Sequence, residues 1–181
     1  MFLALDLPED ARRRIAVWRD QLLAGLDDLR LVAPEALHLT LVFLGPRPEK
    51  EIPSIARAAF EAVAGLPAAG LRPAAATAVP PRRPRLLALD LDDEGGRAAA
   101  IQAAASGALA RGGFHDPEQR PFWPHITLAR AEGGRRAPSV PADPPPDQPF
   151  AASEVALYRS LLHPEGARYE RLERLRLSPQ R

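Results

Sequence analysis

The 181-residue sequence predicts an α+β fold, in which strands and helices follow one another irregularly along the chain. Two features support this class. Apolar residues recur with the period of a strand in some segments and with the period of a helix in others. Clusters of Pro and Gly separate these segments, as expected of loops. With 46% hydrophobic residues, the chain can bury a substantial core.

The first strand and the first helix illustrate both periodicities. Residues 2–7 form a short apolar run that is typical of a buried strand. Pro8 suits the first position of a helix, and two acidic residues follow it in the first turn, where they interact favourably with the helix dipole. Apolar residues then recur at helical spacing from Ile15 to Leu26, so we expect a helix over 8–27.

The same criteria place the remaining elements. Residues 80–84 and 131–149 are rich in proline, which cannot donate to a sheet ladder, so both segments should be loops. Pro53 leaves the start of the second helix open. The expected strands cover 37–44, 71–79, 85–91, 123–130, 150–160 and 168–177, and the further helices cover 49–64 and 94–111.

The order of elements contains an internal repeat. Residues 2–43 and 85–128 both run strand, helix and then a strand that contains a histidine. This repetition suggests a duplication. We therefore expect a single domain over 1–181, made of two pseudo-symmetric lobes that share one core.

Charge and composition exclude several classes of protein. The net charge of +1 gives no strong overall field, so any binding of nucleic acid must be local. The chain has no cysteine, which excludes disulfides and thiolate chemistry. Its apolar stretches are far shorter than the roughly 20 residues of a membrane span. No basic region precedes the apolar start, so we expect no secretory signal, no membrane association and a cytoplasmic location.

The most informative feature is a repeated tetrapeptide, His-x-Thr-Leu, which begins at His38 and again at His125. Side chains on a strand alternate between its two faces. The histidine and threonine of each motif, with Thr40 and Thr127, should therefore share one face. The apolar residues between and after them, including Phe43, should anchor the opposite face in the core.

This pattern fits acid–base chemistry on a phosphodiester. Opening a cyclic phosphate needs one group to deprotonate water and another to protonate the leaving oxygen. A histidine pKa of about 6.5 lets one imidazole be neutral while the other is protonated near neutral pH. The hydroxyls of Thr40 and Thr127 can donate to non-bridging phosphate oxygens. This chemistry requires no metal, and we expect neither a metal nor a cofactor.

Simpler interpretations of the histidines exist. A single His-x-Thr-Leu is most often just part of a half-buried strand. A metal site would need a third ligand, and His115 and His163 lack a ligand-like spacing to either motif. We interpret these two histidines as ordinary loop residues.

The sequence around the motifs resembles the 2H phosphoesterase superfamily. It is most similar to the bacterial and archaeal RNA 2′,3′-cyclic phosphodiesterases, also called 2′-5′ RNA ligases. The similarity spans nearly the whole chain in order. The residues that carry it are FLALDLP at 2–8, LHLTLVFLG at 37–45, Pro84-Arg85, RPFWPHITLAR at 120–130, LYRS at 157–160, Gly166 and Tyr169.

The resemblance implies a bilobal fold with two antiparallel sheets around a central cleft and helices on the outside. It implies hydrolysis of RNA 2′,3′-cyclic phosphate ends to 2′-phosphates, and some members also join RNA ends in the reverse direction. It assigns the base to His125 and the acid to His38, whereas the near-symmetric motifs alone leave these roles open. The expected partner is RNA with a cyclic phosphate end, or a small cyclic nucleotide, bound by a monomer.

Further side chains near the motifs are candidates for substrate contact. Arg130 resembles a phosphate-contacting arginine of the family, although strict alternation puts it on the core face unless the strand bends near Ala129. Trp123 shares the face of His125, where it could stack on a base or close the lobe. We interpret the arginines of the 80–85 segment as solvated, with contact to RNA phosphates as the alternative.

Two other functions stay open from the sequence. The chain could be an RNA-end-binding module with little turnover, although the presence of both histidines argues against this. It could also be a phosphodiesterase that acts on another cyclic or strained phosphate.

Overall fold

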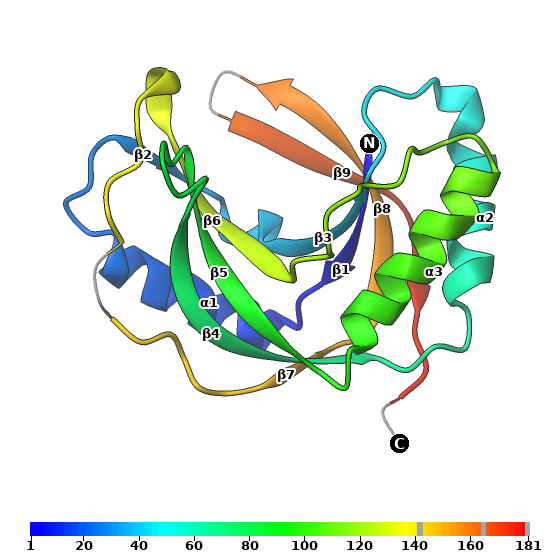
Figure 1. The fold of residues 1–181 in the computed structure, drawn as a ribbon, viewed down its shortest axis with the longest axis horizontal. Helices are drawn as coiled ribbons and strands as arrows, with labels where there is room; N and C mark the ends of the chain where they lie inside the picture. Colours follow the sequence, from blue (N-terminus) through cyan, green and yellow to red (C-terminus); the bar gives the residue numbers. More distant parts are fainter. Residues whose placement is uncertain (141–142, 164–165, 180–181) are drawn as a thin grey trace.

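The computed structural model describes residues 1–140, 143–163 and 166–179. Its strands form one curled sheet in the order β7-β4-β5-β6-β3-β1-β8-β9, with β2 paired to β6 (Figure 1). The strands are β1 (Phe2–Asp6), β2 (Leu29–Leu31), β3 (His38–Phe43), β4 (Ala69–Val79), β5 (Leu86–Glu94), β6 (His125–Ala131), β7 (Phe150–Ala152), β8 (Glu154–His163) and β9 (Gly166–Arg176). The α-helices are α1 (Glu9–Leu22), α2 (Ile52–Val63) and α3 (Arg97–Arg111).

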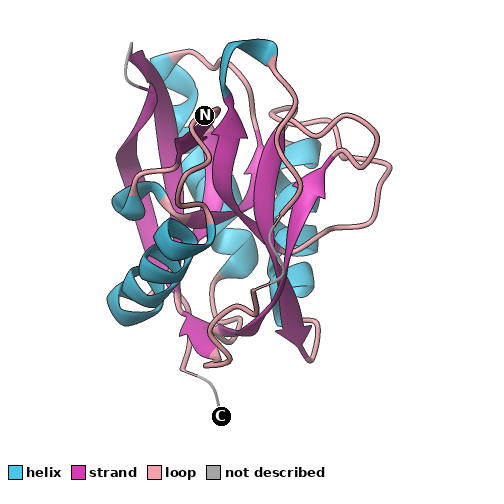
Figure 2. Cartoon of the chain, turned by 90° about the vertical axis from the view of Figure 1, so that its left-hand side faces the viewer, coloured by secondary structure: helices cyan, strands magenta, loops and turns pink. Residues whose placement is uncertain are grey.

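The α+β class and the antiparallel pairing expected from the resemblance are confirmed. The two expected sheets are the two halves of one continuous sheet. They join where β3 meets β6, through the single residue pair Leu39 and Ile126. The helices lie outside the strands, with α1 on one side of the molecule and the paired α2 and α3 on the other (Figure 1, Figure 2).

Most element boundaries agree with the sequence prediction, and the differences have local causes. The first helix ends at Leu22 rather than near residue 27, and a turn with Gly25 at positive φ follows it. The third helix begins at Arg97 rather than 94, because β5 continues to Glu94. The carboxylate of Asp93 then accepts hydrogen bonds from the backbone N–H groups of Ala98 and Ala99 in the first turn of α3, at 2.9 Å each.

Two short strands were not predicted. The three-residue β2 pairs with the outer part of β6, and its length gives too little periodicity to detect. The segment 150–160, expected as one strand, divides at Ser153 into β7 and β8. These two strands pair with opposite ends of the sheet, β7 with β4 and β8 with β1.

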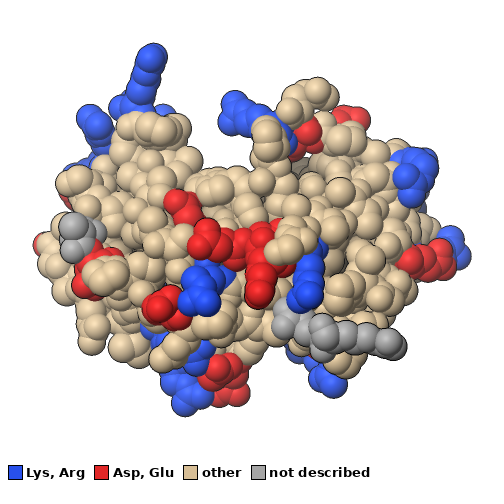
Figure 3. All heavy atoms as spheres, turned by 60° about the horizontal axis from the view of Figure 1, so that its bottom comes forward, with Lys and Arg blue, Asp and Glu red and all other residues tan. Residues whose placement is uncertain are grey.

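The apolar faces of the sheet and the helices meet in one hydrophobic cluster. The motif strands β3 and β6 lie at the centre of the strand order, so rigid neighbours hold them on both sides. The surface is hollowed at one edge, and basic side chains lie on both sides of the hollow (Figure 3). Within the described residues, no helix has the length and apolar character needed to cross a bilayer.

Candidate active site

A β-bulge interrupts each motif strand at the leucine of His-x-Thr-Leu. Consecutive residues of β1 pair with Thr40 and Val42, which leaves Leu41 as an extra residue on β3. The same irregularity occurs on β6, where Leu128 is the extra residue opposite β5. Both leucines are buried together with the residue that follows them. The alternation of the strand therefore shifts by one residue after each motif.

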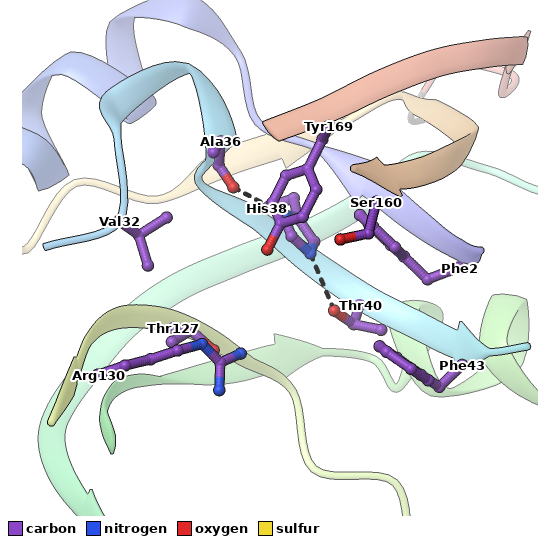
Figure 4. Close-up of a pocket in the computed structure, with 10 residues that line it drawn as sticks. All are labelled: Phe2, Val32, Ala36, His38, Thr40, Phe43, Thr127, Arg130, Ser160 and Tyr169. Atoms are coloured by element: carbon purple, nitrogen blue, oxygen red, sulfur yellow. Dashed lines mark hydrogen bonds between the residues drawn. The ribbon is translucent and has the colours of Figure 1, made fainter. Parts of the chain in front are cut away.

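This shift changes the face of the residue five positions after each histidine. Phe43 was expected in the core, but its side chain is 64% exposed and lines the cleft, so that prediction is wrong. The bulge at Leu41 is the physical reason. On β6 the bulge at Leu128 supplies the bend that Arg130 needs, and the Arg130 guanidinium extends into the cleft (Figure 4).

The single pair that joins β3 to β6 also aligns the two motifs. Leu39 and Ile126, which pair with each other, are the variable residues of the two His-x-Thr sequences. In an antiparallel register centred on this pair, the histidine of each motif lies across from the threonine of the other. The structure thus brings both histidines and both threonines to one stretch of the sheet.

The imidazole of His38 is fixed by two hydrogen bonds. Its Nδ1–H donates to the carbonyl oxygen of Ala36 at 2.7 Å, since a carbonyl can only accept. The other nitrogen, Nε2, is then unprotonated in the neutral ring and accepts from the Thr40 hydroxyl at 3.0 Å (Figure 4). Phe2 stacks on the ring at 4.8 Å between centroids, and Tyr169 meets it edge-on at 5.3 Å.

Burial lowers the pKa of His38 below its usual value of about 6.5. The Ala36 carbonyl and the nearby Asp6 carboxylate oppose this shift, whereas Arg130 and His125 add to it. The neutral imidazole is therefore favoured in the free protein. Its Nε2 has the lone pair needed to accept a proton.

This shift predicts a contribution of His38 to the pH dependence of stability. As the pH falls below about 6.5, His38 binds a proton in the unfolded chain before it does so in the native state, so the free energy of unfolding decreases. The slope from this one group is at most about 1.4 kcal/mol per pH unit. We expect urea denaturation at several pH values to show a smaller loss of stability below 6.5 for His38→Gln than for the wild type. An unchanged pH dependence in His38→Gln would contradict the shift.

The imidazole of His125 is positioned by a hydrogen bond to a backbone carbonyl and by a stacked indole. Its Nδ1–H donates to the carbonyl oxygen of Trp123 at 2.8 Å, so Nε2 is unprotonated in the neutral ring. The indole of Trp123 stacks on the ring at 3.8 Å between centroids. The indole N–H donates to Asp90 at 3.1 Å, and the Thr77 hydroxyl donates to the other oxygen of Asp90 at 2.6 Å.

These contacts predict a positioning role for Trp123. Trp123→Phe keeps an aromatic ring beside His125 but loses the hydrogen bond to Asp90, and Trp123→Ala loses both. If the ring holds the imidazole, Trp123→Ala should lower catalytic efficiency about two- to tenfold more than Trp123→Phe, as expected for one aromatic pair. Steady-state kinetics of the two variants measure this difference, and equal losses would show that stacking contributes nothing. Stacking of Trp123 on a substrate base stays a prediction.

The cleft consists of two pockets that meet at the motifs. The smaller has a volume of about 210 Å³ and contains His38, Phe2, Tyr169 and Ser160 among its lining residues. The larger, of about 670 Å³, contains His125. Four residues line both pockets: Thr40, Phe43, Thr127 and Arg130. The predicted phosphate-binding side chains therefore lie between the two histidines.

Several residues of the cleft were not predicted as part of a site. His115, expected as an ordinary loop residue, does lie in a loop but lines the larger pocket.

Arg82, Arg83 and Arg85 are exposed, and none of these three side chains lines either pocket. Among the described residues, no group of three or more His, Cys, Asp or Glu side chains could hold a metal ion. His163 was expected in a loop, but it is the last residue of β8, so that prediction is wrong; its side chain lies outside the described part of the structure.

Comparison with known proteins agrees with the geometry. A family profile of the 2′-5′ RNA ligase superfamily matches residues 7–164. The chain belongs to the 2′-5′ RNA ligase superfamily. The resemblance to 2H phosphoesterases inferred from the sequence is thereby confirmed.

Curated members of this superfamily match over nearly their whole length. An RNA 2′,3′-cyclic phosphodiesterase of Thermus thermophilus is 33% identical, with 98% of this chain and 89% of that protein covered. A protein of the same name from Methanothermobacter thermautotrophicus is 29% identical, with 97% of both chains covered. E. coli LigT, solved in complex with 3′-AMP, superposes with a TM-score of 0.82 at 29% identity, covering 98% of this chain and 97% of LigT.

Proposed function

We propose that this member of the 2′-5′ RNA ligase superfamily hydrolyses RNA 2′,3′-cyclic phosphate ends to 2′-phosphates. One observation carries the proposal: the two histidines line two different pockets, and the pockets share Thr40, Thr127 and Arg130. A phosphate bound to these three side chains would have one imidazole on each side. In-line displacement at phosphorus requires this arrangement, since the nucleophile enters opposite the leaving oxygen. The names of the curated relatives point to the same reaction.

The proposed reaction needs only proton transfers and charge stabilisation from the protein. One histidine removes a proton from water through Nε2, and the water oxygen forms the new bond to phosphorus. The bond from phosphorus to the 3′ oxygen breaks, and the other histidine protonates that oxygen. The threonine hydroxyls and the Arg130 guanidinium stabilise the charge on the non-bridging oxygens.

The resemblance assigns the base to His125 and the acid to His38, and the pH profile tests whether the two imidazoles act as an acid–base pair. One imidazole must carry a proton and the other must be neutral, so kcat/KM should be bell-shaped in pH. Burial lowers the pKa of His38 in the free protein, so the limb that reports His38 should lie below about pH 6.5. A bound anionic phosphate favours the imidazolium, so this limb should move to higher pH in kcat. A profile with a single limb would contradict an acid–base pair.

The decisive experiment is incubation of the protein with nucleoside 2′,3′-cyclic phosphates in the presence of EDTA, with the products identified by phosphorus NMR. We expect the 2′-phosphate to accumulate. Tight binding of an oligonucleotide with a cyclic phosphate end, without product, would instead favour an RNA-end-binding module. If kcat/KM is higher for another cyclic phosphate than for nucleoside 2′,3′-cyclic phosphates, that other class is the substrate.

We also propose that one chain is sufficient for activity and that the protein acts as a monomer. Both histidines, both threonines and Arg130 come from the same chain and line one cleft. The matching bulges and the pairing of Leu39 with Ile126 support two pseudo-symmetric lobes within 1–181. Gel filtration combined with activity measurements at different protein concentrations tests the monomer.

A further inference from the structure

The internal repeat extends beyond His-x-Thr-Leu to an identical pentapeptide, Leu-Ala-Leu-Asp-Leu, at 3–7 and 87–91. The first copy covers the end of β1 and the second lies in β5, the strands that precede α1 and α3. All residues of both copies are buried except the aspartate, Asp6 in one and Asp90 in the other, which is partly exposed. A polar group in such a strand is costly unless it finds a partner, so the repeated aspartate needs an explanation.

Each of these aspartates is the cross-strand partner of a motif histidine. Asp6 pairs with His38 between β1 and β3, and Asp90 pairs with His125 between β5 and β6. In both copies the alanine of the pentapeptide pairs with the motif threonine and the next leucine pairs with the variable residue. Directly paired residues project from one face of a sheet, with Cβ atoms about 4.5–5.5 Å apart. The repeat therefore places one carboxylate next to each imidazole.

On the His125 side, the carboxylate holds the ring that stacks on the imidazole. One oxygen of Asp90 accepts the indole N–H of Trp123 at 3.1 Å, and the other accepts the hydroxyl of Thr77 at 2.6 Å. The same indole stacks on His125 at 3.8 Å between centroids. Two donors from different segments thus fix the orientation of Asp90, and Asp90 fixes the indole against the imidazole.

On the His38 side, the carboxylate also binds an aromatic side chain. Asp6 accepts the hydroxyl of Tyr158 at 2.6 Å, and its side chain is only 11% exposed. Phe2 stacks both on the Tyr158 ring, at 5.3 Å, and on the His38 ring, at 4.8 Å. Burial and the hydrogen bond to Asp6 raise the pKa of Tyr158, so the phenol keeps the proton that it donates. The same order of carboxylate, aromatic ring and imidazole therefore occurs on both sides of the cleft.

Charge gives Asp6 a second means of acting on His38. Burial lowers the pKa of His38, and the Asp6 carboxylate opposes this because a negative charge favours the imidazolium. In the proposed reaction each histidine carries a proton at one stage, and a neighbouring carboxylate stabilises that stage. The other charged or titratable groups near His38 and Tyr158 are Arg12, Arg130, Arg171 and His125.

From these contacts we propose that Asp6 and Asp90 are a repeated pair of positioning residues, each of which orients one catalytic imidazole through the aromatic side chain that it binds. The inference rests on the proposed function and adds residues that line neither pocket of the cleft. A purely structural role for the aspartates would change stability but would not couple each of them to its ring in catalysis.

Double-mutant cycles test whether each aspartate acts through its ring. Asp90→Ala should lower kcat for a nucleoside 2′,3′-cyclic phosphate by about 10- to 100-fold, a loss typical of partners that orient metal-bound histidines. KM should not change, because Asp90 does not line the cleft. Combined with Trp123→Phe, which removes the same hydrogen bond, Asp90→Ala should add little further loss. The cycle of Asp6→Ala with Tyr158→Phe should give the same result.

Asp92→Ala is the matched control for these cycles. Asp92 is exposed on the same strand as Asp90 and lines neither pocket, so its loss should leave kcat unchanged. Additive losses in either cycle would overturn the proposal for the pair. A rise in KM at unchanged kcat would also overturn it, because the aspartates would then act in substrate binding.

NMR titration of 15N-labelled histidines tests the Asp6 side without turnover. Asp6→Asn keeps the size of the side chain and one acceptor oxygen but removes the charge, so the pKa of His38 should fall. Asp90→Asn should leave the pKa of His38 unchanged, since Asp90 pairs with the other histidine. No change in Asp6→Asn, or the same change in both variants, would overturn the proposal. An inactive wild type would count against the proposed function alone, because the titration measures proton binding.

Discussion

Replacing His125 or His38 by alanine should lower kcat for hydrolysis of a nucleoside 2′,3′-cyclic phosphate by about 10² to 10⁴-fold each. Each histidine has one nitrogen held by a backbone carbonyl, at 2.8 Å for His125 and 2.7 Å for His38, so only Nε2 is available to the substrate. Alanine removes that nitrogen. If both imidazoles act in one step, the double variant should lose much less activity than the product of the two single losses.

The chemical roles can be separated with a substrate whose leaving group is a weak base. An aryl phosphodiester needs no acid to expel its phenolate, so a variant that lacks only the acid should recover much of its lost rate. The assignment implied by the resemblance, with His38 as the acid, predicts this recovery for His38→Ala and none for His125→Ala. Recovery in His125→Ala alone would reverse the assignment. His163→Ala, which removes a histidine outside both motifs, serves as the control and should keep full activity.

The sequence predicted which motif side chains line the cleft better than it predicted the geometry of the strands that carry them. Strand alternation placed His38 with Thr40 and His125 with Thr127, and each pair does line the cleft together. The same rule failed at Phe43, because a bulge depends on how two strands pair and not on the sequence of one strand. Four consecutive apolar residues follow Thr40, and such a run is compatible with either a regular strand or a bulged one.

The side chains that hold each histidine in place could not be predicted from the sequence either. Trp123 was placed on the face of His125, but its hydrogen bond reaches Asp90, which lies 33 positions away on β5. Phe2 and Tyr169, which flank His38, come from opposite ends of the chain. Contacts of this kind arise from the order of strands in the sheet, and a single sequence gives no direct information about that order.

The bulges also show how a nearly symmetric backbone produces two different sides of a cleft. After equivalent bulges, the equivalent positions hold Phe43 in one motif and Arg130 in the other. Phe43 reaches the boundary of the two pockets from the strand of His38, whose imidazole Phe2 and Tyr169 flank. The guanidinium enters from the other motif. This difference gives a bound phosphate ester a preferred direction, which two identical motifs would not provide.

Removing the hydroxyl of either motif threonine should have the next largest effect on activity. Thr127→Val and Thr40→Val keep the shape and the β-branch of the side chain, so the strands should be retained. Each loses one donor to the non-bridging oxygens, for which a fall in kcat of about 10² to 10³-fold is expected. The loss should appear mainly in kcat, since charge on these oxygens grows as the reaction proceeds.

Serine at the same positions separates the contribution of the hydroxyl to activity from that of the methyl group. Thr127→Ser keeps the donor and should stay much closer to the wild type than Thr127→Val. At position 40 the hydroxyl also donates to His38 Nε2 at 3.0 Å in the free protein, so Thr40→Val removes a contact to the imidazole as well. That bond stabilises the neutral ring, so its loss should raise the pKa of His38 and move the corresponding limb of the kcat/KM profile to higher pH. Thr127→Val should leave that limb in place, and equal shifts in the two variants would show that the Thr40 hydroxyl does not act on His38.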